Sequence, residues 1–407
     1  MMRFAKAISG DVQKYINRYS RYHQSILTIE QFTHFGKNAE PLGSYKFLRN
    51  EVPVRLAHIM QEISHLPKNL LSMRSVDLVR SWYVQSFIDL MEFQDAPFNV
   101  DTVDRFTKTL HAIKRRHDST VETMAQGIIE LKESEGESCF LPAVQYFLDR
   151  FYMNRIGIRL LISQHLALFK ENLNDSSEKF IGVFEPNCCV KTILKDAIEN
   201  ASFLCEQSYF VFPQVMINEV NTLSKGSEIY INYVPSHLYY ILFEILKNAM
   251  RATVESHKNS DDLPSIQATI VKGNEDLTIK ISDEAGGIPR SNIEKLFAYH
   301  YSTAPEPNKT THGSPMAGYG YGLPLSRLYA KYFGGDLQIV SMDGLGTSAY
   351  IYLKTLSHDA HEVIPSYNSS VAKASYENSN SAQSNTRDWS SNSFYEKTKS
   401  FAKPSQK

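Results

Sequence analysis

The sequence has little cysteine, no long apolar run and almost no net charge. Its four cysteines show no CxxC spacing, which argues against a disulfide framework or a zinc site and favours a reducing compartment. The apolar runs, of which 238–243 is typical, are far shorter than the roughly 18 to 20 residues that a membrane span needs. Lys and Arg number 43 against 44 Asp and Glu, so the chain has no large field to attract nucleic acid or an anionic membrane.

Glycine is unevenly distributed and divides the chain into three regions. Residues 1–178 hold 6 glycines, residues 179–357 hold 13, and the last 50 residues hold none. The length of 407 residues predicts two domains with a remainder. The remainder is 358–407, where 12 Ser and 5 Asn between 366 and 407 predict a flexible tail that cannot bury a core.

The first domain, 11–178, has the periodicity of helices and no strand pattern. Apolar residues at steps of three or four predict a bundle of about four long antiparallel helices. The clearest stripe is Val103, Phe106, Leu110, Ile113, His117, Val121, Met124, Ile128 and Leu131. Residues 1–25 carry five basic residues against one acid, which fits either a mitochondrial targeting segment or an ordinary first helix.

The second domain, 179–357, mixes helical and strand patterns. These patterns predict an α/β sandwich with one mixed sheet covered by helices. Helices are expected near 188–208, 236–256 and 322–334, and strands near 228–234, 265–272, 277–282, 337–341 and 347–353.

Three polar residues share one face of the expected helix around 236–256. Glu244, Asn248 and Arg251 lie at positions i, i+4 and i+7. This stripe is either a solvated face or a ligand site, because burying an acid, an amide and an arginine without a partner would be costly.

Glycine-rich segments follow this helix at three places. Asp283 ends a strand and precedes Gly286 and Gly287, as in a turn or as in a site where a carboxylate reads the exocyclic amine of a base. Residues 318–322 read GYGYG before a helix that has Pro324 in its first turn, an arrangement that suits phosphate binding. A last Gly-Thr pair ends at Thr347, where a hairpin turn is equally typical.

The order of these segments resembles the N, G1 and G2 boxes of the GHKL ATPases, the class of bacterial histidine kinases, DNA gyrase B and the ninety-kilodalton heat-shock chaperone. The resemblance implies that Asn248 binds Mg²⁺, that Asp283 reads adenine, and that residues 297–317 form a lid over ATP. It assigns ATP contacts to Glu244, Asn248, Arg251, Asp283, Gly287, Ser302, Thr303, Gly318, Tyr319, Gly320, Tyr321, Gly322, Leu323 and Thr347. The expected fold is then an α + α/β chain, a four-helix bundle followed by a GHKL sandwich.

Six segments carry a narrower resemblance within that class: KNAMRATVE at 247–255, YSTAP at 301–305, GYGLPLSRLYAKYF at 320–333, EVPVRL at 51–56, TMAQG at 123–127 and YFLDRFYM at 146–153. With these segments, the chain resembles the mitochondrial pyruvate dehydrogenase kinase family over about residues 11–357. The resemblance implies a protein serine kinase of the mitochondrial matrix that inactivates the decarboxylase component of the pyruvate dehydrogenase complex. Glu244 would polarise the substrate serine.

Two residues depart from the family pattern. Tyr240 stands one helical turn before Glu244, where the family usually has a histidine, so a phenol would orient the base without supplying a positive charge. Ala285 replaces the first glycine of the G1 box, which costs about 1 kcal/mol or more only if its φ is positive.

The resemblance also implies regulatory and docking sites. Tyr83, His117, Arg155 and Arg159 would bind a pyruvate-like acid, although a core histidine and surface arginines are the plainer interpretation. The remaining implied contacts are a lipoyl-arm pocket at Leu27, Phe32, Phe35 and Phe47, and a homodimer whose tails are anchored by Asp388 and Trp389.

Other functions remain as alternatives. The close one is a branched-chain 2-oxo-acid dehydrogenase kinase of the same family. Another is a weakly active, ATP-gated scaffold for lipoyl domains, suggested by Tyr240 and Ala285. A histidine kinase is disfavoured because the chain has no acceptor-histidine segment of bacterial type, and the HRD, DFG and P-loop motifs of other kinases are absent.

Overall fold

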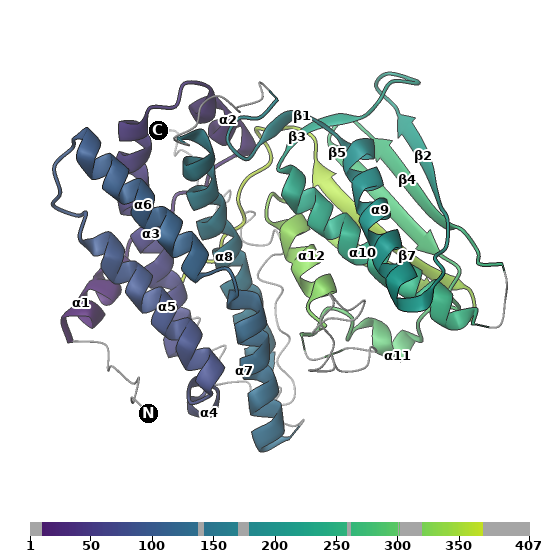
Figure 1. Cartoon of the computed structure of the whole chain (residues 1–407), viewed down its shortest axis with the longest axis horizontal. Coiled ribbons are helices and arrows are strands. Elements are labelled where there is room, and N and C mark those ends of the chain that lie inside the picture. The colour runs from purple at the N-terminus through teal and green to yellow at the C-terminus, as the bar shows by residue number, and fades with distance from the viewer. Residues whose placement is uncertain are drawn as a thin grey trace, which may run out of the picture.

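The computed structural model describes residues 10–136, 142–169, 179–258, 262–299, 301 and 320–368. A helical domain lies beside an α/β domain (Figure 1). The helices of the first domain are α1 (Gly10–Tyr19), α2 (Ile29–Lys37), α3 (Pro41–Ser64), α4 (Lys68–Leu71), α5 (Arg74–Met91), α6 (Val100–Arg116), α7 (Thr120–Glu135) and α8 (Pro142–Leu168). Within the described residues, none of the helices combines the length and the apolar run needed to cross a bilayer.

The predicted bundle is confirmed, with α3 packed against α5, α6 and α8. The long stripe at 103–131 does not form one helix, because α6 ends at Arg116 and α7 begins at Thr120. The chain turns at His117, whose carbonyl accepts hydrogen bonds from Thr120 Oγ1 at 2.9 Å and from Arg155 Nη2 at 3.2 Å. Apolar spacing continues through the turn and so gives no sign of it.

The α/β domain contains the predicted mixed sheet, in the strand order β2-β4-β5-β7-β6. The strand β2 is parallel to β4, and the other neighbours are antiparallel. The elements are β1 (Glu185–Cys189), α9 (Val190–Tyr209), β2 (Val215–Asn221), β3 (Tyr230–Tyr233), α10 (Pro235–Ser256), β4 (Ile266–Lys272), β5 (Asp276–Asp283), α11 (Arg290–Ile293), α12 (Gly322–Lys331), β6 (Asp336–Met342) and β7 (Gly346–Lys354). The sequence predicted neither β1 nor β2, and β2 is an edge strand that buries neither face completely. The strand predicted near 228–234, β3, is not part of the five-stranded sheet but pairs with β1 in a separate two-stranded sheet.

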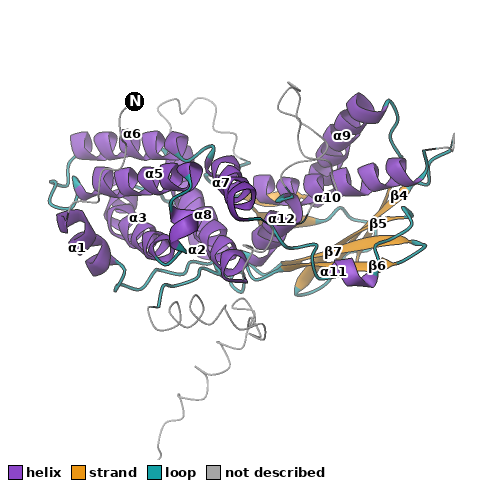
Figure 2. Ribbon diagram, turned by 90° about the horizontal axis from the view of Figure 1, so that it is seen from below, coloured by secondary structure: helices purple, strands orange, loops and turns teal. Residues whose placement is uncertain are grey.

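The helices α10 and α12 lie on one face of the sheet, with α9 beside α10 (Figure 2). The residues of β5 and β7 that point toward them are buried: Leu277, Ile279, Ile281, Ala349, Ile351 and Leu353. The opposite face is less covered, and Tyr350 and Tyr352 stack on it with ring centroids 6.4 Å apart. The sheet therefore has one core face and one face without a described helix.

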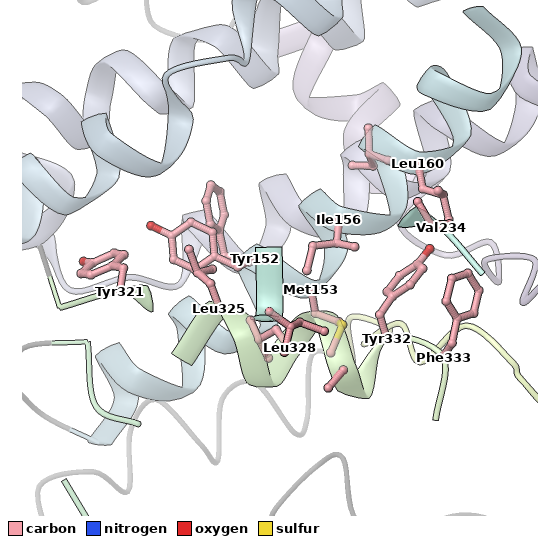
Figure 3. Close-up of a cluster of buried hydrophobic side chains, with 14 of the residues drawn as sticks. Tyr152, Met153, Ile156, Leu160, Val234, Tyr321, Leu325, Leu328, Tyr332 and Phe333 are labelled. Carbon is pink, nitrogen blue, oxygen red and sulfur yellow. The ribbon is translucent and has the colours of Figure 1, made fainter. Parts of the chain in front are cut away.

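The two domains meet along α8 and α12. Leu325 and Leu328 of α12 lie in one buried cluster with Met153 and Ile156 of α8 (Figure 3). At the start of the chain, α1 packs on α3 with Ile16 only 2% exposed, so residues 10–19 of the expected targeting segment belong to the folded domain.

A C-terminal strap, residues 355–368, returns from β7 to the helical domain. Its Glu362 is 2% exposed and accepts hydrogen bonds from Arg55 Nη1 at 2.9 Å and Nη2 at 2.8 Å, from the Leu27 amide at 3.0 Å, and from the Tyr332 hydroxyl. Arg150 donates to the carbonyl of Ser366 at 2.9 Å. The compact part of the chain thus extends to at least 368, beyond the boundary predicted at 357, because a buried ion pair anchors the strap.

We expect Glu362→Leu to lower the free energy of unfolding by about 3–5 kcal/mol, since it leaves the Arg55 guanidinium buried without its main carboxylate. The measurement is the midpoint of guanidinium unfolding. Glu199→Leu on the exposed side of α9 is the matched control and should change stability by less than about 0.5 kcal/mol. Equal effects of the two variants on the free energy of unfolding would contradict this role of the buried Arg55–Glu362 pair.

Candidate active site

The stripe of Glu244, Asn248 and Arg251 lies on α10, opposite the apolar residues that face the core. The side chain of Glu244 is 13% exposed, and its Oε1 lies 2.9 Å from Nζ of Lys247, which is 11% exposed. Arg251 Nε lies 4.0 Å from Oε2 of Glu255. The stripe is thus largely covered and charged, unlike a freely solvated helix face.

The carboxylate of Glu244 contacts the turn that begins α12. A Cβ at Gly322 would lie only 2.1 Å from Oε2 of Glu244, so this position has no room for a side chain unless the carboxylate moves. Gly320 takes a φ of +80°, and Tyr321, the N-cap residue, provides no side-chain hydrogen bond to the first turn. The first N–H groups of α12 therefore lack a side-chain acceptor, as in helix termini that bind anions.

Asp283 is fixed where β5 ends. Its Oδ1 accepts hydrogen bonds from the amides of Ala285 at 3.1 Å and Thr347 at 3.2 Å, and Thr347 is its register partner on β7. Burial raises the pKa of Asp283, and the two backbone hydrogen bonds oppose that rise. The structure thus brings together the sequence-predicted pair Asp283 and Thr347.

The G1 turn interlocks with the hairpin between β6 and β7. Gly287 has a φ of +76°, and a Cβ there would lie 2.0 Å from the carbonyl oxygen of Met342. Ser341 Oγ accepts from the amide of Ile288 at 2.7 Å and lies 2.9 Å from Thr347 Oγ1. Ser341 was not among the predicted residues, because its contacts depend on the register of the hairpin. Lys247 was not predicted either, although its i+3 spacing from Glu244 is a signal that could have identified it.

The two departures from the family pattern have different outcomes. In the described part of the chain, Phe210 is the one residue other than glycine with a positive φ, so Ala285 carries no strain of that kind. The ring of Tyr240 packs against Tyr329 of α12 at 4.9 Å, and burial, followed by the charge of Glu244, raises its pKa. No hydrogen bond joins Tyr240 to Glu244 among the described residues, and Lys247 is the partner of the carboxylate instead.

The remaining residues predicted to contact ATP differ in burial, and some of them lie outside the described residues. Tyr321 is 7% exposed and its ring lies in the core, so only its backbone can face a nucleotide. Leu323 is half-buried in the first turn of α12. Four predicted contacts lie outside the described residues: Ser302, Thr303, Gly318 and Tyr319.

A second site lies inside the helical bundle. A small pocket, partly open to solvent, is lined by all four residues of the predicted regulatory pocket together with Lys114, which was not among the predicted residues. The four predicted residues are Tyr83, His117, Arg155 and Arg159.

The charges of this pocket suit an anion. Burial, and then Arg155, lower the pKa of His117 to about 3, so the imidazole is neutral, and its Nε2 lies 2.9 Å from Ser86 Oγ. Arg159 donates to Asp118 at 2.9 Å. Nε of Arg155 and Nη1 of Arg159 are buried without hydrogen-bond partners in the described structure. Two such guanidinium groups can bind a small carboxylate.

The four residues of the predicted lipoyl pocket do not share one environment. Phe32 is 4% exposed and stacks on Phe184 at 5.1 Å, so it belongs to the core. Phe35 is 39% exposed, and Leu27 and Phe47 are half-buried.

The fold and the site define an ATPase domain of the GHKL class. Residues 233–357 match the family "Histidine kinase-, DNA gyrase B-, and HSP90-like ATPase", and residues 26–185 match "Mitochondrial branched-chain alpha-ketoacid dehydrogenase kinase". The chain belongs to the family of mitochondrial pyruvate dehydrogenase kinases, as its similarity to curated relatives shows.

Three of these relatives illustrate the similarity. The chain is 49% identical to isozyme 3 of pyruvate dehydrogenase kinase from mouse, with 91% of each chain covered. It is 50% identical to isozyme 1 of the same kinase from human, with 88% of this chain and 84% of the relative covered. It is 48% identical to the Drosophila melanogaster enzyme over 98% of this chain and 97% of the relative. All three are named mitochondrial [pyruvate dehydrogenase (acetyl-transferring)] kinases.

We expect Gly287→Ala to abolish ATP binding, because its Cβ would meet the backbone of Met342 and displace the hairpin that positions Thr347 beside Asp283. Gly286→Ala is the matched control: its φ is also positive, at +82°, but a Cβ there has nothing within 4 Å. The control should cost about 1 kcal/mol of stability and still bind ATP. Calorimetric titration with ATP distinguishes the two variants, and equal affinities would refute the interlock.

Proposed function

We propose that the chain uses Mg²⁺ and ATP to phosphorylate serines on the decarboxylase component of the pyruvate dehydrogenase complex, and thereby inactivates that complex in the mitochondrial matrix. The observation that supports the proposal most is the contact of the Glu244 carboxylate with Gly322 at the start of α12, since Glu244 lies one helical turn before Asn248 on α10. An acid, an amide suited to Mg²⁺ and a helix N-terminus suited to phosphates are then close together. Identities of 48–50% to named pyruvate dehydrogenase kinases support the same activity.

Asn248 is the residue that would hold Mg²⁺. The metal keeps several waters and takes phosphate oxygens, so one protein amide is an adequate ligand. Asp283, held by two backbone amides, accepts a hydrogen bond from adenine. The turn at Gly320 and Gly322 receives the phosphates.

Glu244 polarises the hydroxyl of the substrate serine. Lys247 holds its carboxylate in place at 2.9 Å and adds a positive charge beside the phosphates. Phosphoryl transfer then depends mainly on in-line positioning and on neutralising phosphate charge. Bound Mg²⁺ supplies most of that neutralisation.

Different observations disfavour the two alternative functions, the branched-chain kinase and the weakly active scaffold. A branched-chain kinase has the support of the family description for residues 26–185, whereas relatives that are 48–49% identical over most of the chain are named pyruvate dehydrogenase kinases. The hypothesis of a weakly active, ATP-gated scaffold loses one of the two observations that suggested it, because Ala285 does not have a positive φ.

Assembly and docking follow as parts of the same proposal. The chain forms a homodimer through the sheet face without a described helix, where Met216, Val340 and Met342 are 53%, 49% and 61% exposed. The lipoyl arm of the acetyltransferase core docks at Phe35, with Leu27 and Phe47, above the buried Phe32.

Asn248→Ala should abolish Mg²⁺-dependent ATP binding and phosphorylation of purified pyruvate dehydrogenase, because the site offers no second ligand of this kind on α10. Calorimetry and mapping of phosphoserine measure the two effects. Asn200→Ala on the exposed side of α9 should leave both unchanged. Full nucleotide affinity in Asn248→Ala would contradict the assignment of the metal site.

Dichloroacetate, a pyruvate mimic, should inhibit the kinase through the bundle pocket, and Arg155→Ala should remove this inhibition while ATP binding persists. The reason is the loss of a guanidinium that lines the cavity. Arg115→Ala, an exposed substitution on the same bundle helix as Lys114, is the control and should keep the inhibition. Inhibition that survives in Arg155→Ala would place the ligand elsewhere.

A further inference from the structure

Three hydrogen bonds join helix α8 of the helical domain to the segment that follows α11. Gln145 Nε2 donates to the carbonyl of Phe297 at 3.1 Å, and Gln145 Oε1 accepts from the amide of Tyr299 at 3.2 Å. The hydroxyl of Tyr299 donates to Asp149 Oδ1 at 2.9 Å. We call these four residues the interdomain latch. It connects positions that are about 150 residues apart in the sequence.

The latch is buried and charge-assisted. Tyr299 is 3% exposed. Burial raises the pKa of Asp149 to about 6, against the opposing effects of Tyr299, Gln145, Lys331 and Arg327. Near neutral pH the phenol therefore donates to an ionised carboxylate away from water, which is one of the stronger kinds of hydrogen bond in proteins.

The latch adjoins the turn that begins α12. The ring of Tyr299 packs against Tyr321 at 4.9 Å, and both rings contact Tyr152 of α8, at 5.5 and 6.0 Å. In Figure 3, Tyr152 and Tyr321 lie at the end of the cluster where α12 begins. Tyr321 is the N-cap residue of α12 and immediately precedes Gly322, which contacts Glu244.

We propose that Gln145 and Asp149 are positioning residues for phosphotransfer: through Tyr299 and Tyr321 they hold the first turn of α12 in the geometry that binds the ATP phosphates. The helical domain thus contributes to the nucleotide site without touching the nucleotide. The inference rests on the proposed function only in taking this turn as the phosphate site.

Deletion of the hydrogen bond between Tyr299 and Asp149 should weaken ATP binding about tenfold. A hydrogen bond to a charged group contributes at least the free energy that corresponds to a tenfold change in affinity. Tyr299→Phe keeps the ring and removes the donor, whereas Asp149→Ala removes the acceptor. Both variants delete the bond between Tyr299 and Asp149, and Asp149→Ala also removes the acceptor of Gln145 Nε2 at 3.4 Å. The double variant should therefore be no worse than Asp149→Ala alone. Asp149→Asn retains an acceptor and should restore the affinity to within about threefold of wild type.

The kinetic readout separates positioning from general damage. We expect KM for ATP to rise about tenfold in Tyr299→Phe, while kcat at saturating ATP stays within about threefold of the wild-type value. The reason is that bound ATP restores the conformation of the turn that begins α12. Partial unfolding would instead lower kcat at unchanged KM. Tyr45→Phe is the matched control: it deletes the hydroxyl of a fully buried tyrosine that donates to Phe93 within the helical domain, and should change neither constant.

The full-length wild type, the single and double variants, and the control are titrated with ATP by calorimetry and assayed with purified pyruvate dehydrogenase. If Asp149→Ala fails to fold, Tyr299→Phe and Asp149→Asn decide the question. Wild-type affinity in Tyr299→Phe, or additive losses in the double variant, would overturn the latch. A wild-type chain that does not bind ATP would instead overturn the proposed function.

Discussion

Helix α12 is held against the helical domain at both ends, directly at its first turn and through the strap at its other end. At its first turn, Tyr321 packs on Tyr152 of α8. At its other end, Tyr332 donates to Glu362, which pairs with the buried Arg55 of α3. Between these ends, leucines of α12 pack into the apolar surface of α8 (Figure 3). A nucleotide site built on the first turn of α12 is therefore fixed relative to the bundle as well as to the sheet.

The same helix α8 carries both the latch and the pocket arginines. Tyr83, which lines the pocket, contacts His117 at 4.4 Å and Phe151 at 5.5 Å, and Phe151 contacts Tyr152 at 5.2 Å. An unbroken series of aromatic contacts thus runs from the predicted regulatory pocket to the turn that begins α12. Because the interior is closely packed, a displacement at one end of this series is felt by its neighbours.

Local sequence patterns predicted the parts of this structure that depend on local geometry. The stripe on α10 follows from helical spacing, and Asp283 follows from its place at a strand end before glycines. The α6–α7 break was missed because it depends on tertiary contacts of His117, and β2 was missed because an edge strand has no continuous apolar side. The latch joins Asp149 to Tyr299, 150 positions apart, and the strap joins Arg55 to Glu362, 307 positions apart. No local sequence pattern contains both partners of either pair.

The surroundings of Glu244 explain how the site accommodates Tyr240. His237 brings no positive charge, because burial lowers its pKa to about 3. Lys247 is the ion-pair partner of Glu244 instead, with its Nζ 2.9 Å from the carboxylate. The ring of Tyr240 packs against Tyr329 and adds to the contact between α10 and α12. At this departure from the family pattern, Tyr240 thus contributes a packing contact between α10 and α12, and Lys247 is the charged partner of Glu244.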